Sequence, residues 1–189
     1  MKVTIHQPEH FPYLGFFQKM NKADIIVILD NVNFRKNYFQ NRNRFKNSQG
    51  VEEWFTIPVP KDAVKKQIKD VKPSETNWRN KILKKLSYNF KLDLTHVYET
   101  ELLADINIRS IVYCAGRLGV DTPIIRAATL SAEGSKSELL GNICKELNAK
   151  EYISGPSGRD YLDLSYFEGI DVSFFEPNVP NLYTTLANL

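Results

Sequence analysis

The sequence has few cysteines, no long apolar run and no apolar leader, and each shortage narrows the class of protein. The two cysteines, Cys114 and Cys144, lie within apolar patterns of helical period, which favours reduced thiols buried in a cytosolic protein. No apolar run reaches the length of about 18 residues that a membrane-spanning helix needs. The chain starts with a strand pattern and not with an apolar signal segment, so we expect no secretory signal and a cytoplasmic location.

Motifs of two common hydrolase classes are absent as well. Neither Gly-x-Ser-x-Gly nor His-Glu-x-x-His occurs in the sequence, and these are the signatures of α/β-hydrolases and zinc proteases. Histidine is scarce too, since the chain has only three. His6 and His10 stand four residues apart, but two imidazoles without a cysteine or carboxylate at a suitable spacing do not make a metal site. We therefore predict no metal centre.

Positive charge is present in excess, and it is unevenly placed. The 189 residues carry a net charge of +3. Residues 1–91 hold 18 Lys/Arg against 8 Asp/Glu, a net charge of +10, whereas residues 92–189 hold 7 against 14, a net charge of −7. This asymmetry indicates that the first half faces a phosphate, a nucleotide or a nucleic acid. A solvated basic face without a ligand is the alternative.

The apolar pattern predicts strands and helices in alternation. Strands are predicted at 2–7, 24–30, 52–60, 65–73, 122–130, 150–155 and 171–177, and helices at 13–23, 77–91, 104–120, 135–149 and 159–169. The continuous β-branched run at 24–30 is typical of a strand buried on both faces, and 65–73 is rich in lysine, as edge strands are. We predict one α/β domain over 1–189, with a three-layer, Rossmann-like, mainly parallel sheet. Residues 50–75 form a small β-rich insertion in this prediction.

Polar residues follow several of the predicted strands. His6 and Gln7 end the first strand, Asp30 ends the second, and Ser154 ends a later one. Ligands of open parallel sheets bind beyond the carboxyl ends of the strands, so we expect these residues to converge. His6, His10 and Asp30 are the candidates for catalysis.

The segment SGPSGR at 154–159 predicts an anion site. Its candidate residues are Ser154, Gly155, Ser157, Gly158 and Arg159. Backbone N–H groups at the start of a helix, together with serine hydroxyls, bind phosphate. The spacing matches neither the P-loop nor Gly-x-Gly-x-x-Gly, and an ordinary strand-to-helix turn is the alternative.

A second basic segment, NVNFRKNYFQNRNRFK at 31–46, holds five basic residues and no acid. Its candidates for binding substrate or phosphate are Asn33, Lys36, Asn41, Arg42 and Arg44. Arginine makes bidentate contacts with phosphate, and the interleaved aromatics stack on bases or sugars. The alternative is a solvated loop whose aromatic side chains pack on the core. Because Arg42 and Arg44 have no acid nearby in sequence, we expect them to matter more for binding than for folding.

Histidine titrates near neutral pH, so His6 and His10 are candidates for moving a proton. A strand end holds a side chain more rigidly than a loop does, so we expect His6 to be the general base. His10, with Gln7 and Tyr13, is then expected to orient the substrate or its phosphate. The alternative is that the histidines make structural hydrogen bonds.

Four segments together resemble the WbqC-like proteins. They read HQPEHFPYLGFFQKMNKAD, LDNVNFRKNYFQNRNRFK, WFTIPV and ELLGNICKELNAKEYISGPSGRDYLD. Members of this family are found among genes for surface polysaccharides and specialised metabolites, some near genes for amino sugars decorated with amino acids. The resemblance therefore implies a transferase that acylates or aminoacylates an amino-sugar-type acceptor carrying phosphate or nucleotide. No cofactor is assigned, and a nucleotide or CoA-type donor is left open.

The opening also looks like that of adenylyl-transferring nucleotidyltransferases, which implies a nucleotidyltransferase-like version of the fold. Those enzymes use paired histidines to stabilise charge on the transferring phosphate. Here Pro8-Glu9-His10 is followed by Phe-Pro-Tyr, so the glycine and the second histidine of that motif are missing. Two alternatives to the transferase thus stay open: an adenylyltransferase, and a non-catalytic module that binds nucleotide or RNA.

Overall fold

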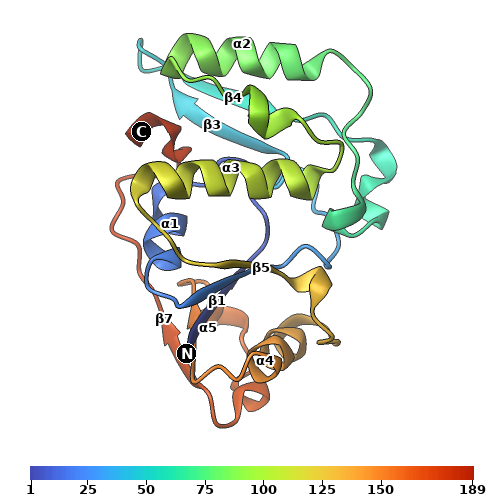
Figure 1. Cartoon of the computed structure of the whole chain (residues 1–189), viewed down its shortest axis with the longest axis vertical. Helices are drawn as coiled ribbons and strands as arrows, with labels where there is room; N and C mark the ends of the chain where they lie inside the picture. The colour runs from blue at the N-terminus through green and yellow to red at the C-terminus, as the bar shows by residue number, and fades with distance from the viewer. The chain divides into compact units, whose positions relative to one another are not determined.

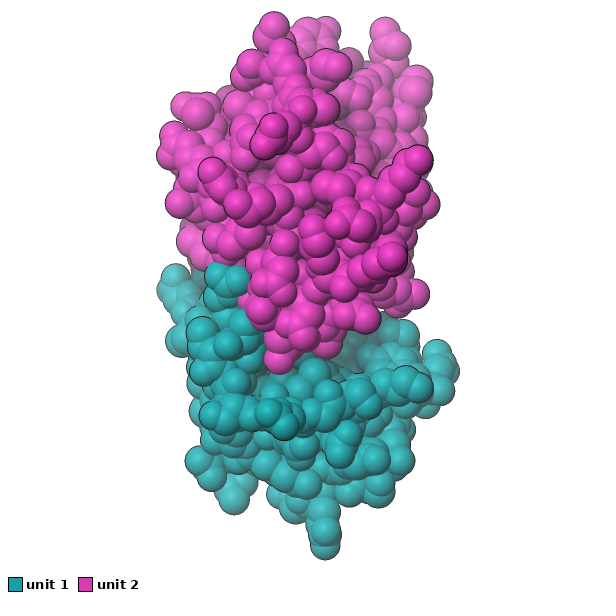
Figure 2. All heavy atoms as spheres, turned by 90° about the vertical axis from the view of Figure 1, so that its right-hand side faces the viewer, with its two compact units in different colours: residues 1–7, 15–29, 120–179 teal, residues 8–14, 30–119, 180–189 magenta.

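The computed structural model describes all residues from 1 to 189, and the chain divides into two compact units. Unit 1 consists of residues 1–7, 15–29 and 120–179, and unit 2 of residues 8–14, 30–119 and 180–189 (Figure 2). Unit 1 holds 8 Lys/Arg against 11 Asp/Glu, a net charge of −3, and unit 2 holds 17 against 11, a net charge of +6. The positive charge of the sequence is therefore concentrated in unit 2.

Unit 1 is built on a five-stranded parallel sheet (Figure 1). Its strands are β1 (Lys2–His6), β2 (Ile25–Ile28), β5 (Ile124–Arg126), β6 (Glu151–Ser154) and β7 (Asp171–Phe174). Its helices are α1 (Leu14–Met20), α4 (Lys136–Glu146) and α5 (Gly158–Tyr161), with the 3₁₀ helices η4 (Ala127–Thr129) and η5 (Leu164–Phe167). The apolar run of β2 is buried on both faces, since Ile26, Val27 and Ile28 are all inaccessible to solvent. This is the burial that a β-branched run in a parallel sheet predicts.

The strand order of this sheet is β5-β2-β1-β6-β7, with every pair parallel. Along the chain the sheet therefore grows outward from β1 in one direction and then in the other, which is the doubly wound order. Right-handed crossovers then put α1 and α4 on opposite faces, and Figure 1 shows α1 above the strands and α4 below them. The prediction of an α/β fold with a mainly parallel sheet covered by helices is confirmed.

Unit 2 combines an antiparallel hairpin with two long helices. The hairpin consists of β3 (Arg42–Lys46) and β4 (Glu52–Thr56), and the helices are α2 (Trp78–Phe90) and α3 (Leu103–Leu118). Its 3₁₀ helices are η1 (Lys61–Lys65), η2 (Ile68–Asp70), η3 (Thr95–Tyr98) and η6 (Thr185–Asn188). The core side of the hairpin packs on α2, where the rings of Phe45 and Phe90 meet edge to face with their centroids 4.9 Å apart. No helix in the structure has both the length and the apolar character that a membrane span requires.

The predicted edge strand at 65–73 is wrong. The segment contains η2 and no strand. Its buried residues, Ile68 and Val71, are three positions apart, which is the period of a 3₁₀ turn and not the period of two that a strand requires.

A strand is also present where a loop was expected, because β3 occupies residues 42–46 of the basic segment. Its inward positions are Asn43 and Phe45, both buried. Since one inward residue is polar, the alternation that marks a strand is hidden in the sequence.

Two further elements are shorter than predicted. The expected helix at 159–169 is split into α5 and η5, because the Asp163 carboxylate accepts a hydrogen bond from the Ser165 backbone N–H at 3.0 Å and starts a new turn there. The expected strand at 122–130 ends at Arg126, where η4 begins. Both cysteines, in contrast, are buried free thiols as predicted.

Candidate functional site

The site with the best topological position is the carboxyl edge of the sheet in unit 1, between β1 and β6. The strand order reverses its direction of growth between these two strands, and ligands of doubly wound sheets bind at such switch points. The register pairs Thr4 with Ile153, so the two strands end side by side at His6 and Ser154. The structure therefore brings these two predicted site residues to one edge.

His6 is held at this edge in a defined protonation state. Its Nδ1 lies 2.9 Å from the backbone carbonyl oxygen of Gln7. A carbonyl oxygen only accepts hydrogen bonds, so Nδ1 carries the proton and the lone pair of the neutral ring is on Nε2. The edge of the Phe16 ring packs against the imidazole, with centroids 4.8 Å apart. The strand end, the carbonyl and the ring together fix the orientation of His6.

The pKa of His6 is lowered to about 3, chiefly by burial and also by the charge of the Lys19 ammonium, whereas the hydrogen bond to the Gln7 carbonyl acts in the opposite direction. The imidazole is therefore neutral at physiological pH. Lys19 is itself buried on α1. The charge of Lys19 therefore acts on His6 from within the protein.

The turn at 154–159 is tightly packed. Ser154 is 1% exposed, and its hydroxyl hydrogen-bonds the hydroxyl of Tyr152. A Cβ atom on Gly158 would lie only 2.2 Å from Ser154 Oγ, so the first residue of α5 has to be a glycine. Gly155 and Ser157 lie nearer the surface, with Ser157 exposed. Because α5 has only four residues, its own dipole is weak.

Arg159 lies at the rim of the same turn. Its guanidinium forms an ion pair with Glu176 and stacks over the ring of Phe174, 4.9 Å from the centroid. The Glu176 carboxylate therefore offsets the positive charge of the Arg159 guanidinium, which the sequence predicted to bind phosphate.

The third predicted catalytic residue, Asp30, belongs to unit 2. It is fully buried, and its backbone carbonyl accepts a hydrogen bond from Lys69 N at 2.9 Å. Among the predicted binding residues, Asn33 is bridged to Gln67 and is exposed, as Lys36 is. Asn41 is buried and donates its side-chain N–H to the Ile57 carbonyl at 2.9 Å.

His10 lies inside unit 2 with no exposed surface. Its Nε2 is 3.0 Å from the Tyr98 hydroxyl, and its ring packs against Phe11 and Phe55. Burial lowers the pKa of His10 to about 3. This environment supports the structural alternative for His10. Tyr13 is half-buried in a bridge to Thr184.

The loop around His10 is held by polar side chains that sequence reasoning missed. Asn43 Nδ2 donates to the carbonyls of His10 (3.1 Å) and Phe11 (2.7 Å), and Asn107 Nδ2 donates to that of Pro8 (3.1 Å). The Ser110 hydroxyl accepts from the Phe11 N–H at 3.0 Å. These bonds hold Phe11 at a φ of 48°, an unusual value for an aromatic residue. Much of the HQPEHFPY segment thus serves to build the interior of unit 2.

Arg42 and Arg44 lie on β3, on the face of the hairpin away from Phe45. Arg44 pairs with Glu52 of β4 at 3.1 Å, an acid that lies eight positions away in the sequence. The turn of the hairpin brings the acid to Arg44 across the two strands. Both guanidiniums also stack on Trp54, a residue that the sequence analysis did not single out.

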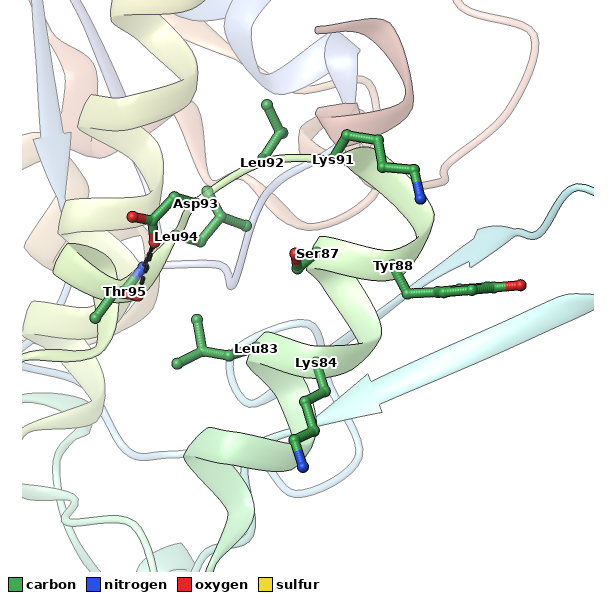
Figure 3. A pocket seen from close by; sticks show the side chains of 9 residues that line it. All are labelled: Leu83, Lys84, Ser87, Tyr88, Lys91, Leu92, Asp93, Leu94 and Thr95. Carbon is green, nitrogen blue, oxygen red and sulfur yellow. Dashed lines mark hydrogen bonds between the residues drawn. The ribbon is translucent and has the colours of Figure 1, made fainter.

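A separate open pocket of about 760 Å³ lies along α2 (Figure 3). Leu83 and Ser87 point toward the turn that carries Leu94 and Thr95, whereas Tyr88 extends away from it. Lys84, Lys91, Leu92 and Asp93 complete the lining. None of the predicted site residues takes part, and the lining offers leucines with lysines at its rim.

Comparison with known proteins finds a family and an uncharacterized relative. A sequence profile of the WbqC-like protein family matches residues 7–188. The chain is 29% identical over 184 residues to the uncharacterized protein Rv1507c of Mycobacterium tuberculosis, which covers 90% of this chain and 79% of that protein. No solved structure matches the chain.

Proposed function

Because the chain belongs to the WbqC-like protein family, we propose that it is a transferase that acylates or aminoacylates an amino-sugar-type acceptor carrying phosphate or nucleotide. The reaction forms an amide bond between the acceptor amine and the donor carbonyl carbon. The bond between that carbon and the donor's leaving group breaks, and the proton lost by the amine ends on the leaving group.

The observation that carries the proposal is the state of His6 at the switch point of the sheet. The hydrogen bond to the Gln7 carbonyl keeps the proton on Nδ1 and the lone pair on Nε2. The low pKa of His6, about 3, keeps the ring neutral, so no proton has to be removed before it can act. Such a weak base takes a proton best after the amine has attacked, when the nitrogen has become positively charged and acidic. His6 can then pass the proton to the leaving group.

The charge around this edge supports an anionic acceptor. Lys19 is buried on α1 and acts on His6 through its charge, so a phosphate nearby would find a cation in a setting of low dielectric constant. Gln7 and Ser157 are side chains of the same edge that can donate hydrogen bonds to phosphate oxygens.

One observation favours a second candidate, adenylyl transfer. The order of the parallel sheet is the one that binds nucleotides at its switch point, and the acyl transfer above does not require it. In this case ATP is the donor. A carboxylate oxygen bonds to the α-phosphorus, the bond from that phosphorus to pyrophosphate breaks, and the AMP group is transferred as pyrophosphate leaves.

The test is a binding and turnover screen with UDP-linked amino sugars, ATP and acyl-CoA. Binding is measured by calorimetry, and acylation of the amino sugar by mass spectrometry. Once a donor and an acceptor that react have been found, His6→Gln should lower turnover by about 100-fold or more while substrate binding is kept. His96→Gln is the control, because His96 is an exposed histidine of unit 2.

Full turnover by His6→Gln would show that His6 does not take part in catalysis. Pyrophosphate release from ATP without amide formation would contradict acyl transfer and support adenylyl transfer.

A further inference from the structure

The solvent-facing side of the β3–β4 hairpin gathers cations on one surface. Side chains of a strand alternate between faces, so Arg42, Arg44 and Lys46 lie on the side opposite the buried Phe45. The hairpin register places Trp54 of β4 directly across from Arg44. With Tyr183 of the C-terminal segment, these residues form what we call the cation–aromatic face: Arg42, Arg44, Lys46, Trp54 and Tyr183.

Cations and rings alternate along this face. The Arg42 guanidinium lies 4.6 Å from the centroid of the Trp54 ring. Arg44 lies between two rings, 5.3 Å from Trp54 and 5.5 Å from Tyr183, and Lys46 is 5.8 Å from Tyr183. Stacking on rings orients the cations without neutralising them.

The protein leaves much of this positive charge uncompensated. Glu52 pairs with Arg44, whereas Arg42 donates to a neutral acceptor, the Asn37 carbonyl, at 2.7 Å. The Nε–H groups of both arginines are buried without an acceptor. Because Glu52 pairs with only one of the three cations of the face, the face keeps a positive charge that favours an oxygen-rich anion. The net charge of unit 2, +6, has the same sign.

We propose that the cation–aromatic face binds single-stranded nucleic acid. Alternate residues of a strand are about 6.7 Å apart, a spacing comparable to that of successive phosphates in an extended single strand. The rings of Trp54 and Tyr183 then lie where unpaired bases can stack, the arrangement that proteins use to bind single strands without reading their sequence. A duplex keeps its bases stacked inside, and an anionic glycan supplies charge without flat rings. The proposal concerns unit 2 only and is independent of the transferase activity proposed for unit 1.

The experiment measures the fluorescence anisotropy of labelled oligo-dT and oligo-U with the full chain as salt rises from about 50 to 200 mM. Three cations on a single strand predict a log–log slope of affinity on salt of about −2. Arg42→Ala with Arg44→Ala should lower affinity by at least tenfold and make this slope shallower. Trp54→Leu should also lower affinity about tenfold, whereas Trp54→Phe, which keeps a ring, should stay within about threefold.

The matched control is Lys61→Ala with Lys65→Ala, which removes the same charge from exposed positions of η1 in the same unit. This variant should bind within about twofold of the wild type. Circular dichroism melts show whether each variant is folded. Equal losses in both double variants would overturn the proposal, because binding would then follow net charge alone. Equal affinity of Trp54→Leu and wild type, or stronger binding of heparin fragments than of oligo-dT, would overturn it in favour of an anionic glycan.

Discussion

Gly158 lies so close to Ser154 that a Cβ atom on the glycine would sit 2.2 Å from the serine hydroxyl oxygen. Ser154 ends β6, and Gly158 begins α5. The absence of a side chain at Gly158 therefore lets α5 pack directly on the carboxyl end of the strand. Gly155, in the same turn, has open space where its Cβ would be. The two glycines of one turn thus have different roles.

We predict that Gly158→Ala destabilises the protein by about 1–3 kcal/mol, because the added methyl group overpacks a closed site. Gly155→Ala should change the free energy of unfolding by no more than about 0.5 kcal/mol. Urea denaturation measures both values. Adding Ser154→Ala to Gly158→Ala removes the oxygen that the methyl group meets and should restore part of the loss. If the two glycine variants were equally stable, the close approach would be unimportant.

The C-caps of α2 and α3 allow a matched prediction about backbone strain. Lys91 has φ 58° and ψ 30°, and Gly119 has φ 66° and ψ 33°. This left-handed conformation costs a residue with a side chain about 1–2 kcal/mol, and glycine avoids that cost. Lys91→Gly should therefore stabilise the protein by about 0.5–1 kcal/mol, whereas Gly119→Ala should destabilise it by about 1 kcal/mol. Opposite signs in denaturant unfolding are the expected result, and a loss of stability in Lys91→Gly would contradict it.

His10 should make the protein sensitive to acid. Its pKa is about 3 in the folded state, against an ordinary value of 6.5, so between these values the unfolded chain binds a proton that the native protein excludes. The contribution to stability is therefore complete above about pH 6.5 and is lost as the pH falls toward 3, by up to about 1.4 kcal/mol per pH unit. His6 acts in the same direction. The free energy of unfolding, measured between pH 7 and 5, should fall less steeply in His10→Gln than in wild type or in the exposed control His96→Gln.

Arg44 and Glu52 form an ion pair across the hairpin. Both side chains are about one-third exposed, so the pair should contribute only about 0.2–1 kcal/mol and weaken with salt. A double-mutant cycle with Arg44→Ala and Glu52→Ala measures this coupling directly. The small value means that the arginine can be removed without unfolding the hairpin. A coupling well above this range, unchanged at high salt, would show a structural ion pair instead.

The doubly wound sheet could be predicted from the sequence because its signals are local. A β-branched run such as 24–30 has to be buried on both faces, and helical patterns such as 135–149 repeat on one face only. The polar residues at strand ends also follow from the sequence, since parallel strands present their carboxyl ends at one edge. On this basis His6 and Ser154 are correctly placed at the same edge.

The remaining errors arise where a residue's environment depends on distant parts of the chain. The strand β3 is hard to predict from the sequence because the polar side chain of Asn43 points inward. Asn43 is stable at this buried position because the carbonyls of His10 and Phe11 accept its hydrogen bonds. His10 lies only four positions after the other histidine of this segment, His6. Its hydrogen-bond partner, however, is the hydroxyl of Tyr98, which lies 88 positions further along the chain.

The sequence by itself determined the class of fold, most of the strands and helices of the parallel sheet, and the excess of positive charge. These features depend on the spacing of apolar residues and on the number of charged residues, which can be read from neighbouring positions in the chain. Only the tertiary structure decided which polar residues are buried and which cations are paired. Hairpin pairing set Arg44 against Glu52 and both arginines against Trp54. Burial and hydrogen bonding are set by groups far apart in the chain, and these contacts determine whether a histidine or an arginine is available to a ligand.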